Sequence, residues 1–326
     1  LQQLSVEANQ LIVIPDGRLS QLNFNTFLTE RPGAGKIKYG NLHYLLNDFS
    51  ISYAYSSTLN FRDILKPSSF SFAGFAPSYK EDEYASLDSA THPLAYQLVR
   101  SGKLALPGAI AEVSTISNYL NGTSWINEKA SESNFKSSSN KFSVLHLAMH
   151  SLLNSEEPEY SELLFNSERD SLNDGYLTID EIYNLDLNAD MVVLSACSSG
   201  SGQVQIGEGP ISFTRAFSYA GCPSVVMSMW KIPDAATTQI MVEFYKNIKN
   251  GDTKDQALRK AQLFYLSNTS DPLYQHPFFW GSFVAMGNTE AIGGISQTRR
   301  VLALIISAVV LIGFFRVRKK IAASYR

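Results

Sequence analysis

Short apolar runs alternate with segments of helical spacing along most of this 326-residue chain. The apolar runs are bounded by turn residues, as strands are: 11–15, 51–55, 69–75, 142–149, 189–196 and 223–230. The helix-like segments repeat apolar residues at every third or fourth position: 109–120, 210–220, 235–248 and 253–266. Strands that alternate with helices favour a mostly parallel sheet with helices on both faces, so the sequence predicts an α/β fold.

Some segments carry more detailed expectations. Residues 51–55 and 69–75 alternate apolar with polar or small side chains, which predicts half-exposed strands. Residues 129–141 (KASESNFKSSSNK) are rich in serine and predict a mobile surface loop. Asp234 and Asp252 stand where helix N-caps belong, and Asp255 completes a capping-box spacing with Asp252.

The composition excludes several classes of protein. Hydrophobic residues make up 44% of the chain and aromatic residues 12%, which is enough for a sizeable core and excludes a wholly disordered chain. The formal net charge of -3 gives no basic surface for nucleic acid, so no nucleic-acid partner is expected. Two cysteines exclude a disulfide scaffold and a multi-cysteine zinc cluster, and we expect no metal and no cofactor.

The C-terminal region combines an uncharged apolar run, 301–315, with basic residues on both sides. Fifteen helical residues span only about 22 Å of a hydrocarbon core roughly 30 Å thick, but flanking arginines and lysines can snorkel and extend the span. This pattern predicts a single-pass C-terminal membrane anchor at 299–320, after a flexible linker at 291–298 and before a short tail at 321–326. The basic residues after the span favour a cytoplasmic tail, with the large domain on the far side of the membrane. Long domains are poor guides to orientation, so the side of the large domain stays open.

Two predicted strands end in residues suited to nucleophilic catalysis. His150 follows the run VLHLAM, and Cys197 follows VVLSA. Reactive groups gather at the carboxyl ends of strands in open α/β sheets, and a nearby imidazole raises the thiolate fraction of a cysteine. The alternative for Cys197 is a buried, inert core cysteine, which is also the interpretation of Cys222. His146 alternates with apolar positions and is interpreted as core or supporting structure.

Neighbouring residues are candidates for the other parts of a site for nucleophilic catalysis. The backbone N–H of Ser151 and the turn around Gly200 are candidates for stabilising an oxyanion. Trp230 ends a strand and is a candidate for a substrate pocket, together with Glu208 and Asp234. Asp234 has the alternative reading of a plain helix N-cap.

Two competing motifs match their patterns only in part, and calcium dependence is left open. Residues 170–181 (DSLNDGYLTIDE) mimic a calcium loop, but Leu172 occupies a position that needs a ligand oxygen. The glycines at 200, 202 and 207 follow a strand, but Gln205 stands where a dinucleotide fingerprint needs its third glycine.

A long ordered series of strings resembles the CHAT domain, a caspase-like peptidase module often found downstream of TPR repeats. The matching strings are LIVIPDG (11–17), ISYAYS (51–56), AEVSTI (111–116), VLHLAMH (144–150), SELLF (161–165), DGYLTIDEI (174–182), ADMVVLSACSSG (189–200), GEGPISFTRAFSYAG (207–221), VVMSMWKIPDAATTQIMVEFYKNI (225–248), ALRKAQ (257–262) and HPFFWGSFVAMG (276–287). The separation of 47 residues from His150 to Cys197 is also close to the roughly 50 of caspase-type enzymes.

The resemblance implies a caspase-like α/β fold with a Cys-His dyad that falls on Cys197 and His150, and it suggests a bacterial source. The chain departs from the family pattern at two places. Ser151 stands where the family usually has glycine, and Ile232-Pro233-Asp234 replaces a Val-Asp-Asp string, which puts a charge-based pocket there in doubt.

From the residues and the resemblance together we predict a membrane-anchored cysteine endopeptidase with a protein substrate. The expected domain is 1–290, with a non-catalytic part at 1–140 and a catalytic part at 141–290. The chain opens with Leu1, so an upstream repeat region or regulatory protein is an expected partner. Two alternatives remain open: a catalytically silent scaffold, and an enzyme held inactive until a partner reorders the loops at 129–141 and 200–209.

Overall fold

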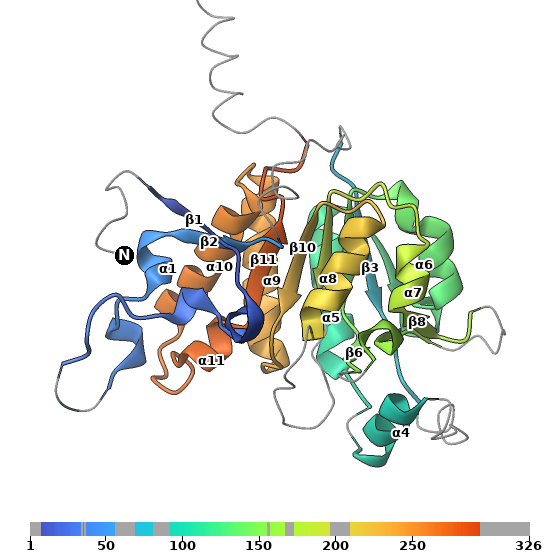
Figure 1. Ribbon diagram of the computed structural model, residues 1–326, viewed down its shortest axis with the longest axis horizontal. Helices are drawn as coiled ribbons and strands as arrows, with labels where there is room; N and C mark the ends of the chain where they lie inside the picture. The colour runs from blue at the N-terminus through green and yellow to red at the C-terminus, as the bar shows by residue number, and fades with distance from the viewer. Residues whose placement is uncertain are drawn as a thin grey trace, which may run out of the picture.

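An eight-stranded sheet runs through the protein, which is represented by a computed structural model (Figure 1). The structure describes residues 8–33, 35, 37–55, 69–80, 92–102, 104–154, 157–166, 173–195 and 209–293. The sheet has the strand order β1-β2-β11-β10-β9-β5-β3-β4. Its strands are β1 (Gln10–Val13), β2 (Ser50–Tyr53), β3 (Phe72–Ala76), β4 (Thr123–Ile126), β5 (Val144–Leu147), β9 (Met191–Leu194), β10 (Ser224–Ser228) and β11 (Phe283–Gly287).

The neighbouring pairs among these described strands are parallel, apart from β10 with β11. The predicted α/β fold with a mostly parallel sheet is therefore confirmed. Strands from both predicted parts, 1–140 and 141–290, belong to this one sheet. A small antiparallel sheet of β6 (His150–Leu152), β7 (Glu162–Leu164) and β8 (Tyr176–Thr178) follows β5 along the chain.

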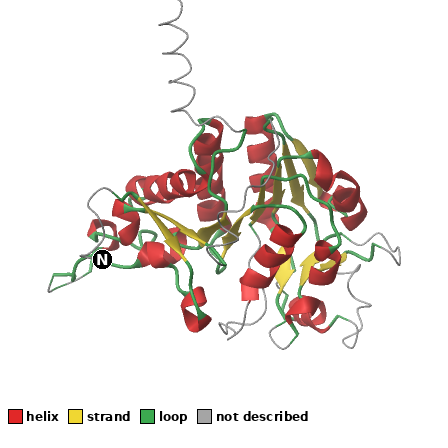
Figure 2. Cartoon of the chain, turned by 45° about the horizontal axis from the view of Figure 1, so that its top comes forward, coloured by secondary structure: helices red, strands yellow, loops and turns green. Residues whose placement is uncertain are grey.

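Helices cover both faces of the large sheet (Figure 2). One face packs against α5 (Pro107–Leu120), α9 (Asp234–Lys249) and α10 (Lys254–Asn268), and the other against α6 (Glu132–Ser138), α7 (Ile179–Tyr183) and α8 (Gly209–Tyr219). The other described α-helices are α1 (Leu45–Asp48), α4 (Pro93–Arg100) and α11 (Pro277–Trp280). Short 3-10 helices are Gly17–Gln21, Phe24–Thr26, Tyr39–Asn41, Asn127–Lys129, Ser139–Lys141 and Pro158–Tyr160.

The two strands predicted to be half-exposed are instead buried along their whole length. Every residue of β2 and β3 is buried, including the polar Ser50 and Ser52. The reason is their place inside the sheet, where helices cover both faces and small side chains pack as well as apolar ones. The prediction of half-exposed strands is therefore wrong.

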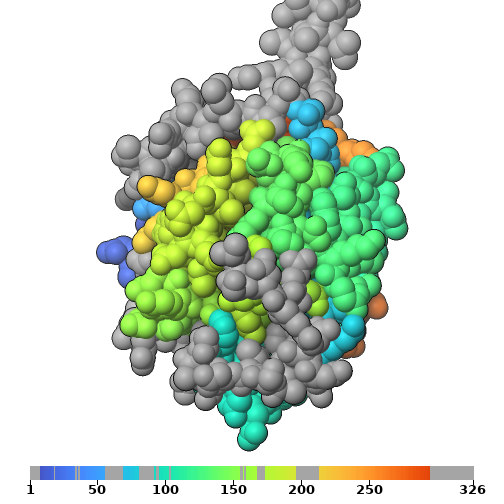
Figure 3. Space-filling view, turned by 90° about the vertical axis from the view of Figure 1, so that its right-hand side faces the viewer, coloured from blue at the N-terminus to red at the C-terminus, as the bar shows by residue number. Residues whose placement is uncertain are grey.

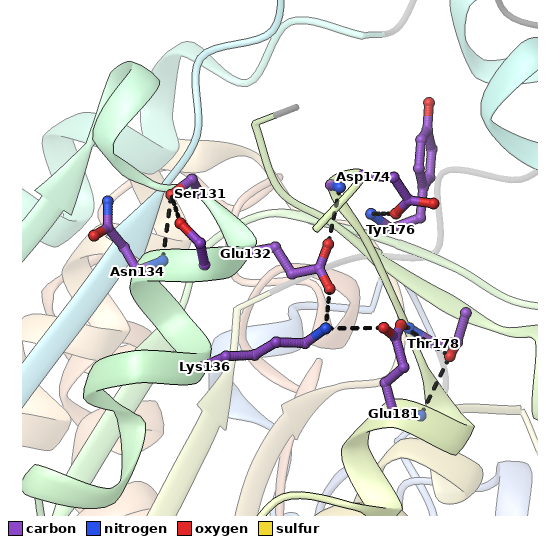
Figure 4. A network of polar contacts seen from close by, with 10 residues as sticks. Ser131, Glu132, Asn134, Lys136, Asp174, Tyr176, Thr178 and Glu181 are labelled. Carbon is purple, nitrogen blue, oxygen red and sulfur yellow. Dashed lines mark hydrogen bonds and ion pairs between the residues drawn. The ribbon is translucent and has the colours of Figure 1, made fainter. Parts of the chain in front are cut away.

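The serine-rich segment 129–141 is also not a loop, because it contains helix α6. Ser131 caps this helix by accepting the backbone N–H of Asn134 at 3.4 Å, and Phe135 is fully buried. Glu132 accepts the backbone N–H of Gly175 at 2.9 Å (Figure 4). Lys136 lies 2.5 Å from the Glu132 carboxylate and bridges to α7. The cap and these long-range contacts account for the failed loop prediction, because serine content alone does not reveal them.

The ion pairs around Lys136 join α6 to α7, which lie side by side in the space-filling view (Figure 3). The Lys136 ammonium is 2.9 Å from Glu181, whose other oxygen accepts the backbone N–H of Thr178 at 2.9 Å. Burial raises the pKa of Glu132, and the Lys136 charge opposes that shift. A buried carboxylate of this kind needs its partners, so α6, α7 and β8 are held as one unit.

The predicted caps of two helices are displaced by one position. The N-cap of α9 is Pro233, and Asp234 is the first helical residue. The N-cap of α10 is Thr253, and Asp252 instead pairs with Lys260 at 2.7 Å. The predicted N-caps at Asp234 and Asp252 are therefore wrong.

The predicted location in a membrane also needs correction. Across the part of the chain that the structure describes, no helix has the length and apolar character required to cross a bilayer. The segment expected to be the anchor, 299–320, lies outside the described residues. The membrane-anchored location is therefore not borne out.

Candidate active site

The carboxyl ends of β5, β9 and β10 lie next to one another in the sheet. Leu147 of β5 is paired with Leu194 of β9, which is paired in turn with Met227 of β10. The backbone N–H of Ser195 donates to the carbonyl of Leu147 at 3.0 Å, so the ladder continues past the end of β9. Adjacent strands lie roughly 4.8 Å apart, so residues that follow them at equal offsets begin from neighbouring positions.

The candidate catalytic residues stand the same number of positions after two residues that are paired across β5 and β9. His150 follows Leu147 by three positions in the sequence, and Cys197 follows Leu194 by three. Trp230 stands three positions after Met227. Cys197, Gly200 and Glu208 lie outside the described residues, so the structural account concerns the side that carries His150.

His150 is buried in β6, with 1% of its surface exposed. Its Nε2 atom lies 2.8 Å from the backbone carbonyl oxygen of Leu104. A carbonyl oxygen only accepts, so Nε2 carries the proton that is donated in this bond. In the neutral ring Nδ1 is then left with its lone pair, as a general base requires.

The surroundings of His150 favour this neutral form. Burial lowers the pKa of His150 to about 4, against the opposing effect of the Leu104 carbonyl, and the charge of Lys231 lowers it further. The imidazole is therefore neutral at pH 7 and able to accept a proton.

The backbone of His150 is held by a tyrosine. The Tyr79 hydroxyl accepts the backbone N–H of His150 at 3.2 Å and donates to the carbonyl of Leu164 at 2.6 Å. Leu164 is the residue paired with His150 across β6 and β7. The sequence offered no signal for the roles of Tyr79 and Leu104, which are 71 and 46 residues from His150.

Two further candidate site residues that the structure describes, Ser151 and Trp230, differ in how far they are buried. Ser151 is buried in β6 beside His150 and is paired with Leu163. Trp230 is half-buried, and its indole N–H donates to the carbonyl of Phe278 at 2.8 Å. Trp230 therefore has a fixed ring close to the strand ends.

Asp234 has a role that neither sequence interpretation anticipated. Its carboxylate accepts the backbone N–H of Gly108 at 3.0 Å, so it caps the first turn of α5 from the start of α9. It also lines a hollow of about 480 Å³ between α5 and α9, with Gly108, Lys246 and Phe264. His150 is not among the described residues that line this hollow.

Cys222 and His146 are interior groups. Cys222 is fully buried, and burial raises the pKa of its thiol to about 12. His146 is fully buried, with Nδ1 3.0 Å from the Tyr245 hydroxyl. Within the described ranges, no group of three or more His, Cys, Asp or Glu side chains is placed to hold a metal ion.

Comparison with known proteins places this arrangement in context. The family model of the CHAT domain matches residues 1–288. The proteins called tetratricopeptide repeat protein 28 from Mus musculus and Homo sapiens are 29% and 30% identical to the chain over 121 residues. The matched stretch is 37% of this chain and 5% of each relative, so the chain corresponds to a small part of those proteins.

Two solved structures are also similar to this chain. The separase-securin complex of Saccharomyces cerevisiae is 15% identical with a TM-score of 0.41, over 77% of this chain and 15% of that chain. The pro- and mature domains of RgpB from Porphyromonas gingivalis are 11% identical with a TM-score of 0.46, over 81% of this chain and 62% of that chain.

Proposed function

This chain belongs to the CHAT domain family, and on that premise we propose that it is a cysteine endopeptidase acting on a protein substrate. Cys197 is the proposed nucleophile and His150 the general base. The observation that supports this most strongly is the common offset of both residues from the paired Leu147 and Leu194. The neutral, Nε2-protonated imidazole of His150 supports it further.

The proposed chemistry follows from the free lone pair on His150 Nδ1. Nδ1 takes the proton of the Cys197 thiol, and the thiolate attacks the substrate carbonyl carbon. The resulting oxyanion needs N–H donors, for which we propose Ser151 and the turn around Gly200. The imidazolium returns its proton to the leaving amine as the peptide bond breaks. Water then hydrolyses the thioester and releases the free thiol.

Further parts of the proposal concern specificity and control. We propose that Trp230 and Glu208 contribute to the substrate pocket, and that Asp234 acts through its cap on α5. An upstream repeat region or a regulatory protein is the proposed controlling partner, in keeping with the tetratricopeptide repeat name of the relatives. The proposed catalytic part is 141–290.

Cleavage of a peptide library by the 326-residue chain tests this proposal. We expect wild type and Cys222→Ala to cut the same peptides, because Cys222 is buried away from solvent. We expect Cys197→Ala to cut none while keeping the melting temperature of wild type. Equal cleavage by Cys197→Ala and wild type overturns the proposal. If wild type does not cut the peptides and a thiol-directed peptide electrophile does not label Cys197, the silent scaffold is favoured.

A further inference from the structure

A buried polar cluster lies behind the carboxyl ends of β5 and β9. We define it by four residues from four elements: Glu112 of α5, His146 of β5, Ser195 directly after β9, and Tyr245 of α9. Glu112 is 3% exposed, and His146 and Tyr245 are fully buried. Glu112 and Ser195 have no role in the chemistry proposed above, and a charged side chain in the interior needs an explanation.

The contacts in this cluster converge on one carboxylate oxygen. The Ser195 hydroxyl donates to Glu112 Oε1 at 2.8 Å, and the same oxygen lies 3.1 Å from Nε2 of His146. The other ring nitrogen of His146 is 3.0 Å from the Tyr245 hydroxyl. The Tyr245 hydroxyl is placed to donate to Nδ1, whereas Nε2 faces the Glu112 carboxylate without the geometry of a hydrogen bond. Burial, with a smaller contribution from the Glu112 charge, raises the pKa of Tyr245, which keeps its hydroxyl protonated.

Ser195 is held by hydrogen bonds at both its backbone and its side chain. Its N–H donates to Leu147 of β5 at 3.0 Å, and its hydroxyl donates to Glu112. A hydrogen bond to a buried carboxylate is stronger than one between neutral groups. Ser195 stands two positions before Cys197 in the sequence and is the last described residue before the proposed nucleophile.

The stretch of chain that leads from Leu104 into α5 also contacts the proposed base, His150. The carbonyl of Leu104 accepts the Nε2 proton of His150, and α5 begins shortly afterwards at Pro107. Asp234 fixes the first turn of α5 through Gly108, so this stretch is anchored to α9 as well. Within residues 104–112, Leu104 therefore contacts His150, and Glu112 contacts Ser195, two positions before Cys197.

We propose that Glu112 is a positioning residue that, through Ser195, sets the approach of the Cys197 thiol to His150. The proposal rests on the proposed Cys197–His150 dyad. It assigns Glu112 no contact with substrate. Through its contact with Ser195, Glu112 lets the packed helix α5 hold the end of β9 in a fixed position relative to the end of β5. Such positioning matters because small misplacements of reacting groups cost large factors in rate.

The test is the rate of iodoacetamide alkylation at Cys197 against pH, followed by mass spectrometry on the 326-residue chain. Cys222, whose thiol pKa is about 12, is the internal unreactive thiol. The variants are Glu112→Gln, Ser195→Ala and the double variant, with Ile116→Val on the same buried face of α5 as the matched control. Cleavage of a peptide substrate is measured in parallel.

We expect Glu112→Gln and Ser195→Ala each to lower the alkylation rate at pH 7 roughly tenfold, because a displaced thiol is no longer in reach of the neutral imidazole that takes its proton. We expect kcat to fall by roughly tenfold to a hundredfold, with KM nearly unchanged. Glu112→Gln leaves Ser195 only an uncharged acceptor, and Ser195→Ala removes the donor of the same contact. The double variant therefore loses no more than the larger single loss. Ile116→Val keeps the wild-type profile.

Each contrary result has a separate meaning. A wild-type Cys197 that reacts at pH 7 no faster than a free thiol overturns the proposed dyad itself. A faster wild-type rate that persists in both Glu112→Gln and Ser195→Ala overturns the positioning role alone. If Glu112→Gln does not fold, Ser195→Ala decides the matter, because it removes a single half-buried hydroxyl.

Discussion

Tyr79 packs against His150 with their ring centroids 5.1 Å apart, and its hydroxyl joins the backbone N–H of His150 to the carbonyl of Leu164. The bridge lies where β6 and β7 pair, so one side chain satisfies two backbone groups of different strands. Buried backbone groups need such partners. The position of the proposed base therefore depends on Tyr79.

Removing this hydroxyl with Tyr79→Phe should reduce both stability and reactivity. Two buried backbone groups lose their partner, which costs about 1–3 kcal/mol of unfolding free energy. Urea unfolding measures this loss, and alkylation of Cys197 at pH 7 measures the effect on the dyad. Tyr44→Phe is the matched control, since the buried Tyr44 donates to the carbonyl of Tyr39 at 2.9 Å. Equal alkylation rates in the two variants would show that Tyr79 does not position His150.

The buried imidazole of His150 should make stability depend on pH. Its pKa is about 4 in the folded protein and about 6.5 in the unfolded chain. Between these values the unfolded chain binds a proton that the folded protein does not. The contribution is therefore fully present above pH 6.5 and is lost as the pH falls toward 4. At pH 5 the loss is roughly 2 kcal/mol relative to pH 7.

The variant His150→Gln isolates this effect, because it keeps all other titrating groups. Urea unfolding of wild type and variant at pH 5, 6 and 7 gives the difference directly. Wild type should lose more free energy of unfolding than His150→Gln as the pH falls. Parallel stability curves would mean that His150 titrates normally in the folded protein.

A fully buried ion pair provides a prediction about the fold alone. The Lys254 ammonium lies 2.7 Å from Asp190, and both side chains are completely buried. Lys254→Met leaves an unpaired buried carboxylate and should cost about 3–5 kcal/mol of unfolding free energy, while Lys254→Met with Asp190→Leu recovers much of that loss. The control is Lys260→Met, whose surface pair with Asp252 should contribute less than about 1 kcal/mol. A loss of the same size for both lysines in thermal or urea unfolding would contradict the interpretation.

Sequence periodicity predicted the elements that carry the site because those elements are regular. Residues 142–149 and 189–196 contain β5 and β9, and the helix at 109–120 matches α5. The parallel orientation of these strands follows from the alternation of strands and helices. The strands that precede His150 and Cys197 were therefore predictable as neighbours, and the proximity of the two side chains stays a prediction.

Exposure and long-range contacts were not predictable in the same way. Burial of Ser50 and Ser52 depends on which strands flank β2, and the helix within 129–141 depends on contacts to Gly175 and Glu181. One missed feature did leave a signal. Glu112 lies in the buried face of α5 beside Val113 and Ile116, where a charged residue is out of place.

The most direct test of the Cys197–His150 dyad is the pH dependence of iodoacetamide alkylation at Cys197, compared between wild type and His150→Gln. The dyad predicts that the neutral His150 imidazole, as general base, makes Cys197 react at pH 7 at least roughly tenfold faster in wild type than in His150→Gln. Superimposable profiles would contradict the dyad and the peptidase function with it.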